Sequence, residues 1–163
     1  MRSPDQTDSK NTAELMICSF LEPINQGLTF SDWPLHLTLA SWFELENKHF
    51  SGFYSLTQQV TQESLPISLT TTEPIRLGFK KTLVGLAIEP NTELYKLHDD
   101  LADLIARYAQ PNNRNYTQDK FLPHITLRKN AILLPGSELT VSRLYVVTKL
   151  DNHYRHVSRL FKP

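Results

Sequence analysis

The sequence predicts an α+β fold in which antiparallel strands are combined with helices. Its 163 residues are enough for one domain with a sizeable apolar interior. Apolar side chains alternate with other residues along some segments, which is typical of strands, whereas two segments show helical spacing. Because these segments do not alternate strictly as strand and helix, their order favours antiparallel sheets over a doubly wound parallel sheet.

Three elements are expected in the first part of the chain. The apolar run at residues 14–21 indicates a buried strand, which Pro23 closes. At residues 35–43 leucines alternate with other side chains, as in a strand with one buried face. Apolar residues recur at helical spacing within residues 48–64, and Pro66 ends this predicted helix.

Two strands joined by a turn are expected next. Residues 67–77 are rich in threonine and isoleucine and predict a strand, in which Pro74 implies an edge position or a bulge. Residues 82–88 predict another apolar strand. The turn between them, at residues 78–81, contains two lysines, whose charges we interpret as keeping an exposed turn soluble.

The clearest helix lies within residues 94–108, where apolar side chains form one stripe at helical spacing. Asn91 or Thr92 can cap its start, and Pro111 ends it. A polar loop is expected to follow at residues 112–119.

Three further strands are predicted in the C-terminal part of the chain. They cover residues 121–128, 138–150 and 153–161, and the last two form a hairpin that turns at residues 151–152. The first residues are polar and mixed in charge. We therefore expect a flexible tail at residues 1–12 and a single domain at residues 13–163.

The charges argue against one class of function. Seventeen Lys and Arg residues balance seventeen Asp and Glu residues, whereas proteins that coat long nucleic acids are usually strongly basic. Residues 1–110 contain eight basic and fourteen acidic residues, and residues 111–163 contain nine basic and three acidic residues. A positive C-terminal third suits a small anionic ligand, and a surface dipole without function is an equal alternative.

Cys18 is the only cysteine, and it lies in an apolar run that is too short to cross a bilayer. A disulfide within the chain is therefore excluded, and the N-terminal residues lack the basic-then-apolar order of a signal peptide. We expect a cytoplasmic monomer with no membrane contact and no obligate protein partner.

Two tetrapeptides, HLTL and HITL, carry the chemistry of the sequence. They begin at His36 and His124, and each lies in a predicted strand just after a proline. On a strand, a histidine and a threonine two residues apart point to the same face, while the intervening apolar residue points to the other. If the two strands are neighbours, His36, Thr38, His124 and Thr126 converge on one cleft.

This set of groups suits reactions at a phosphate. Two imidazoles with pKa values near neutrality can serve as base and acid in one step. Two hydroxyls can donate hydrogen bonds to oxygens on which charge builds. A phosphate that is attacked on one side and releases its leaving group on the other needs these groups and no metal.

Other interpretations of the histidines are weaker. Each one alone would more often be a core-edge residue, but the matching threonines and strands argue against this for the pair. A metal site lacks ligands, because each motif supplies one good ligand and no nearby Cys, Asp or Glu completes a set. His49 and His156 lie in His-x-Ser sequences without the leucine, and we interpret both as surface residues and His98 as a helix-face residue.

The paired motifs, with FLPHITL as the second, resemble those of the 2H phosphoesterases. This superfamily includes the bacterial 2′-5′ RNA ligase and RNA 2′,3′-cyclic phosphodiesterases, and the resemblance covers roughly residues 14–163. It implies two pseudo-symmetric lobes of antiparallel sheet with helices and an active-site cleft between them. It also implies hydrolysis of a 2′,3′-cyclic phosphate to a 2′-phosphate, with no metal and no other cofactor.

The resemblance also implies roles for single residues. His124 is the base that activates water, His36 is the acid that protonates the leaving oxygen, and Thr38 and Thr126 hold the non-bridging oxygens. Some members carry a basic residue just after the second motif. Arg128 shares the strand face of His124 here, so we expect it to contact phosphate, with a solvated strand-end charge as the alternative.

The substrate is less well determined than the chemistry. Relatives act on RNA with cyclic ends, on 2′-5′-linked oligoadenylate or on cyclic phosphates of ADP-ribose, and ligation is the reverse reaction. We expect a nucleotide or an RNA end that carries a cyclic phosphate. A module that binds nucleotides or RNA ends without turnover is the alternative outside enzymes. Trp33, Trp42 and Tyr154 are candidates to stack on a base, and a bulge would turn Trp42 away.

Overall fold

The computed structural model describes residues 11–111, 120–129, 131 and 133–163. The described strands are β1 (Thr12–Phe20), β2 (Thr29–Phe30), β3 (His36–Glu46), β4 (Ile67–Leu77), β5 (Leu83–Ile88), β6 (Gln110–Pro111), β7 (His124–Thr126), β8 (Glu138–Val141), β9 (Leu144–Lys149) and β10 (Arg155–Phe161). The helices are α1 (Phe50–Ser64), which follows a 3₁₀ turn at Asn47–His49, and α2 (Thr92–Tyr108).

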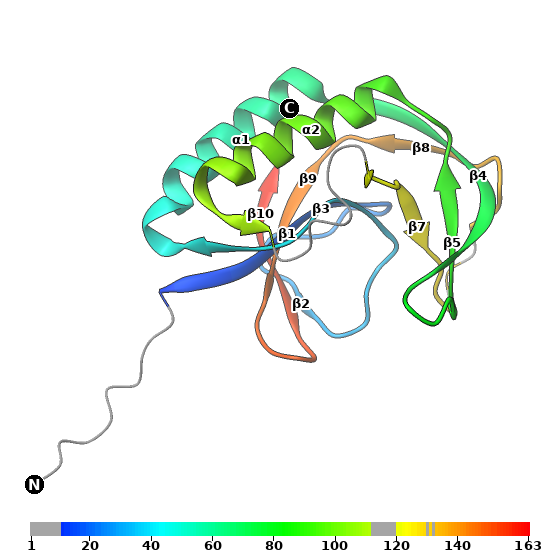
Figure 1. Ribbon diagram of the computed structural model, residues 1–163, viewed down its shortest axis with the longest axis horizontal. Helices are drawn as coiled ribbons and strands as arrows, with labels where there is room; N and C mark the ends of the chain where they lie inside the picture. The colour runs from blue at the N-terminus through cyan, green and yellow to red at the C-terminus, as the bar shows by residue number, and fades with distance from the viewer. Residues whose placement is uncertain (1–10, 112–119, 130, 132) are drawn as a thin grey trace, which may run out of the picture.

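All strand pairs within the described residues are antiparallel, so the predicted α+β class is confirmed. The strands join in the order β2-β10-β9-β1-β3-β7-β5-β4-β8, and β6 pairs with β3. The sheet curls, and both helices lie side by side along one face (Figure 1). The strands on either side of the β3–β7 contact form the two halves of the molecule.

Two apolar clusters stabilise the sheet from its two faces. The larger one lies under the helices and contains residues from both halves, such as Leu39 in β3 and Leu69 in β4. The smaller one covers the opposite face of β1, β9 and β10 and includes Cys18, Phe20 and Tyr145. Successive residues of β1 point to alternate clusters, as the period of a strand requires.

The helices begin and end close to the predicted positions. Asn91 caps α2, because its side-chain oxygen accepts a hydrogen bond from the backbone N–H of Leu94 at 2.9 Å. The apolar stripe of α2 faces the core, with Leu94, Leu97 and Leu101 fully buried. Neither described helix has the length and apolarity that crossing a membrane would require.

The predicted strand at residues 138–150 is wrong, because it is two strands in different halves. β8 pairs with β4, whereas β9 lies between β1 and β10. No glycine or proline marks the break within ELTVSRLYVVTKL, so the sequence gives no turn signal there. The predicted hairpin is confirmed, and Asp151 Oδ1 closes its turn by accepting hydrogen bonds from the N–H groups of His153 and Tyr154.

Other boundaries also differ from the predictions. Thr12 already belongs to β1, so the predicted tail at residues 1–12 is too long, and residues 1–10 lie outside the described part. The predicted loop at residues 112–119 also lies outside it. The short strands β2 and β6 were not predicted. The bulge at Pro74 is confirmed, because the β4–β5 register shifts between Thr71 and Pro74.

Candidate active site

The two His-x-Thr motifs lie on β3 and β7, which are neighbours in the sheet. Leu37 and Ile125 are directly opposite each other in this antiparallel pair. The flanking positions follow from that register, so His36 lies across from Thr126 and Thr38 across from His124. Leu37 is 2% exposed and Ile125 0%, so both strands are anchored by their apolar backs. The two His-x-Thr motifs are therefore related by a local two-fold axis that runs between the two strands.

The histidines share the same hydrogen bond. Nδ1 of His36 lies 2.8 Å from the carbonyl oxygen of Pro34, and Nδ1 of His124 lies 2.8 Å from that of Leu122. A carbonyl can only accept, so each Nδ1 carries the proton and donates it. This fixes the ring orientation and leaves Nε2 of each imidazole to accept or donate a proton in a reaction.

His36 is the more enclosed of the two imidazoles. Its ring lies 4.5 Å from the ring of Trp33 and 6.0 Å from that of Phe20. Burial lowers the pKa of His36 from its ordinary 6.5 to about 4, against the opposing effect of the Pro34 hydrogen bond. The charges of Arg128 and His124 lower it further. In the free protein His36 is therefore neutral at pH 7.

Arg128 lies past the end of β7, which is shorter than the predicted strand at residues 121–128. Its side chain is exposed, and its positive charge is one of the causes that lower the pKa of His36. The prediction that Arg128 shares the strand face of His124 therefore has no basis in the structure, because β7 ends at Thr126. A contact of Arg128 with phosphate therefore stays a prediction.

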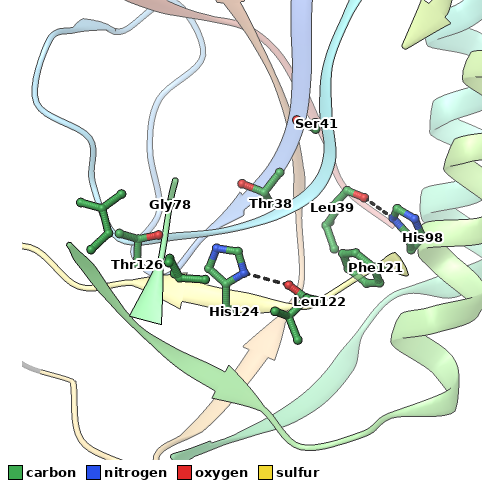
Figure 2. Close-up of a pocket in the computed structure, with 11 residues that line it drawn as sticks. Thr38, Leu39, Ser41, Gly78, His98, Phe121, Leu122, His124 and Thr126 are labelled. Atoms are coloured by element: carbon green, nitrogen blue, oxygen red, sulfur yellow. Dashed lines mark hydrogen bonds between the residues drawn. The ribbon is translucent and has the colours of Figure 1, made fainter. Parts of the chain in front are cut away.

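A pocket of about 270 Å³ opens beside the motifs and contains Thr38, His124 and Thr126 in its wall (Figure 2). The rest of its lining is mostly apolar and comes from four parts of the chain: Leu39, Ser41, Leu77, Gly78, Leu83, His98, Phe121 and Leu122. His36 instead packs against Trp33. The pocket thus combines a polar edge, formed by the motif residues, with a mostly apolar wall, as small-molecule sites commonly do.

His98 is a pocket residue that sequence reasoning did not assign to the site. It is 2% exposed, its Nδ1 donates to the carbonyl of Leu39 at 2.7 Å, and its ring stacks on Phe121 with centroids 3.8 Å apart. Burial lowers the pKa of His98, so the neutral form is favoured. Its position was readable, because residue 98 falls on the buried stripe of α2 between Leu94 and Leu101.

Gly85 in β5 lies directly beneath the site. A Cβ atom there would lie 2.6 Å from Leu77 Cδ1, 3.2 Å from the carbonyl oxygen of Ile125 and 3.6 Å from His124 Cδ2. The absence of a side chain therefore allows Leu77 and His124 to pack over the same point of the sheet. A glycine within an apolar strand was the only sequence signal for this close approach.

The remaining candidates take other positions. Two register shifts between β1 and β3 leave Trp42 on the side of Trp33, with their rings 6.4 Å apart, so the bulged strand does not turn Trp42 away. His49 contacts Tyr108, and His156 contacts Thr29. Within the described part of the chain, no group of three or more His, Cys, Asp or Glu residues is placed to hold a metal ion.

Comparisons with known proteins match most of the chain. Residues 21–152 match the family described as the 2′-5′ RNA ligase superfamily. A candidate phosphoesterase of Geobacillus kaustophilus is 26% identical over 136 residues, which cover 73% of this chain and 72% of that protein.

Solved structures share the fold at low sequence identity. E. coli LigT in complex with 3′-AMP superposes with a TM-score of 0.60 at 18% identity, covering 93% of this chain and 95% of that one. A Thermus thermophilus protein superposes with a TM-score of 0.61 at 17% identity, covering 91% of this chain and 97% of that one. The family match at residues 21–152 contains both strands that carry the motifs and both helices.

Proposed function

Since this chain belongs to the 2′-5′ RNA ligase superfamily of 2H phosphoesterases, we propose that it hydrolyses a 2′,3′-cyclic phosphate to a 2′-phosphate with two histidines and no metal. The observation that carries the proposal is the direct pairing of Leu37 with Ile125. This pairing brings together two motifs that lie far apart in the sequence, and we take them as one site. E. coli LigT has been solved with 3′-AMP, with NADP⁺ and with ATP, which supports a nucleotide or an RNA end as the ligand class.

The reaction divides between the groups as follows. A neutral imidazole takes a proton from water as the water oxygen bonds to phosphorus, and a protonated imidazole gives a proton to the 3′ oxygen as the P–O3′ bond breaks. The product carries a 2′-phosphate and a 3′-hydroxyl. The hydroxyls of Thr38 and Thr126 donate hydrogen bonds to the non-bridging oxygens, and Arg128 balances their negative charge.

The lowered pKa of His36 bears on which histidine acts first. A histidine that is neutral at pH 7 can accept the proton of the attacking water, so the environment of His36 favours the base role for it and the acid role for His124. The resemblance to the family implies the reverse. A bound phosphate anion would raise the pKa of His36 and so favour the acid role, and a substrate with a leaving group that needs no acid distinguishes the two assignments.

The proposal is tested with a short RNA that ends in a 2′,3′-cyclic phosphate, incubated in EDTA and followed by phosphorus NMR. We expect the cyclic signal to convert to a 2′-phosphate, with rates reduced at least about 100-fold in His36→Ala and in His124→Ala. His153→Ala, in the exposed turn before β10, is the matched control and retains activity. Hydrolysis that persists in both active-site variants, or that EDTA abolishes, contradicts the mechanism.

A phosphodiester with a nitrophenolate leaving group separates the two roles, because this group leaves without an acid. The variant of the acid then keeps more of its activity than the variant of the base. If the wild-type protein leaves cyclic-ended RNA intact, the next substrates are nucleoside and ADP-ribose cyclic phosphates and 2′-5′ oligoadenylate. Binding without turnover of any of these identifies a binding module instead.

A further inference from the structure

The turn between β4 and β5 carries an aromatic side chain that nothing in the described part of the protein covers. Phe79 is 103% exposed, more than any other large apolar residue described. Lys80 and Lys81 follow it, and both are exposed. A single exposed apolar side chain is ordinary on a protein surface. A fully exposed phenylalanine next to two lysines is nevertheless a candidate contact for a ligand that has both aromatic rings and negative charges.

The turn holds these residues in place. Gly78 and Lys81 both have positive φ, at +83° and +51°, and the N–H of Lys81 donates to the carbonyl of Gly78 at 3.0 Å. Phe79 and Lys80 are therefore the two central residues of a closed turn. The tip lies at the end of the β4–β5 hairpin (Figure 1). We call residues 79–81 the hairpin tip.

The stem of the hairpin is part of the candidate active site. Leu77, Gly78 and Leu83 line the same pocket as His124 and Thr126. The site and the stem are in contact through the sheet, because Leu77 and His124 meet over Gly85. Gly78 lines the pocket and is followed directly by Phe79, so a ligand that leaves the pocket beside Gly78 comes close to the hairpin tip.

The charge of the hairpin tip is available to a ligand. Neither Lys80 nor Lys81 forms an ion pair with any residue that the structure describes. Arg76, near the end of β4, is also exposed and adds a third positive charge to the hairpin. An aromatic ring beside unpaired cations is the combination that single-stranded nucleic acids bind, with bases on the ring and phosphates on the cations.

We propose that the hairpin tip binds the nucleotide that precedes the cyclic end of an RNA substrate. Phe79 stacks on its base, and Lys80 and Lys81 bind the phosphodiester that links it to the terminal nucleotide. The inference rests on the proposed function and makes it more specific, because the substrate class becomes an oligoribonucleotide end instead of a free mononucleotide.

The test compares kcat/KM on two substrates, a nucleoside 2′,3′-cyclic phosphate and a five-nucleotide RNA with the same terminal cyclic nucleotide. Phe79→Ala is expected to lower kcat/KM on the RNA about fivefold or more and to leave the nucleoside substrate within about twofold. Phe79→Trp keeps a stacking ring and retains the RNA rate. Phe79→Leu keeps an apolar side chain without the ring and behaves like Phe79→Ala.

The lysines are tested by their dependence on salt. The double variant Lys80→Ala/Lys81→Ala is expected to lower kcat/KM on the RNA and to make it fall less steeply with salt concentration. Lys162→Ala, an exposed lysine near the C-terminus, is the matched control and leaves both quantities unchanged. Equal losses on both substrates indicate a structural role for the hairpin tip and overturn the proposal, as does an unchanged rate on the RNA.

The nucleoside substrate separates this proposal from the proposed function. If wild-type protein hydrolyses it and the Phe79 variants do not alter the preference for RNA, only the hairpin tip is wrong. If wild-type protein hydrolyses neither substrate, the affinity for the same RNA is measured by fluorescence anisotropy in wild type and Phe79→Ala. Weaker binding in the variant supports RNA contact at the tip, and equal binding overturns it.

Discussion

At the scale of single residues, the two histidines have the same hydrogen bond but different surroundings. The carbonyls of Pro34 and Leu122 fix the same ring proton in each motif. Trp33 and Phe20 then remove water from His36, whereas His124 opens onto the pocket. One motif sequence therefore yields two different acid–base environments, and the difference comes from residues outside the motifs.

The lowered pKa of His36 predicts a stability that falls with acid. The unfolded chain takes up a proton at this residue near pH 6.5 and the folded chain only near pH 4, so the contribution is present above pH 6.5 and is lost as the pH falls toward 4. The loss amounts to about 3 kcal/mol at most. Burial of His98 acts in the same direction.

Urea denaturation at pH 7 and at pH 4.5 measures this effect. His36→Asn keeps a donor for the Pro34 carbonyl and removes the titrating group, so the free energy of unfolding should change less between the two pH values than in wild type. His153→Asn, in the exposed turn, should match the wild-type difference. An equal pH dependence in His36→Asn and wild type would falsify the burial argument.

The sequence predicted the motif residues of the candidate site but not the other residues that line its pocket. His36, Thr38, His124 and Thr126 followed from two short patterns with a period of two, and the structure brings them together on adjacent strands. The pocket wall did not follow, because Leu77, Leu83 and Phe121 have no chemical signature that separates them from core residues. Their role depends on which strands become neighbours, which a single sequence does not specify.

At the scale of elements, the β5 strand determines how closely the hairpin stem approaches the site. Thr126 is the partner of Gly85 in the β5–β7 pair, and Ile75 is its partner in the β4–β5 pair. The missing side chain lets Leu77 of β4 lie close to His124 of β7 across the strand between them. Three strands thus position the His124 ring, and their closest approach is at a glycine.

Gly85→Ala should therefore disturb both stability and activity. The new methyl group displaces Leu77 and presses on the backbone of Ile125, which we expect to cost about 1–3 kcal/mol in the free energy of unfolding and to lower kcat/KM on the cyclic phosphate. The double variant Gly85→Ala/Leu77→Ala gives the methyl group room and should recover part of both losses. Strictly additive effects of the two substitutions would contradict this contact.

At the scale of the whole molecule, the two halves share one core. The cluster under the helices contains β3 and β9 residues from one half and β4 and β8 residues from the other, together with both helices. The sheet also continues through the seam between β3 and β7. The halves are therefore expected to unfold together, although the strand order divides them.

Leu69→Ala tests this coupling, since Leu69 lies in β4 and is 4% exposed. We expect a loss of about 2–5 kcal/mol, seen equally in circular dichroism and in the fluorescence of Trp33 and Trp42, which lie in the other half. The exposed Ser68→Ala, next to it in β4, should leave the stability close to that of wild type. A fluorescence transition unaffected by Leu69→Ala would show halves that unfold separately.

The class and the order of most elements could be predicted because local patterns determine them. The route of the chain between halves could not, since β8 and β9 follow each other through Ser142 and Arg143 without a glycine or proline. β9 reads as a continuous apolar run because both of its faces are buried. β9 is separated from β8 because it pairs with β1 and β10, and such long-range pairing cannot be recognised from the local sequence.

The local two-fold axis between Leu37 and Ile125 makes the two His-x-Thr pairs equivalent when viewed from either end of the site. A phosphodiester threaded through them in either sense would meet an imidazole first and a hydroxyl across from it. The proposed catalytic set, taken alone, therefore cannot distinguish the 5′ from the 3′ direction of a bound strand. The direction of a bound strand would then depend on the features that differ between the two sides. These are the indole ring of Trp33 beside His36 and the pocket beside His124.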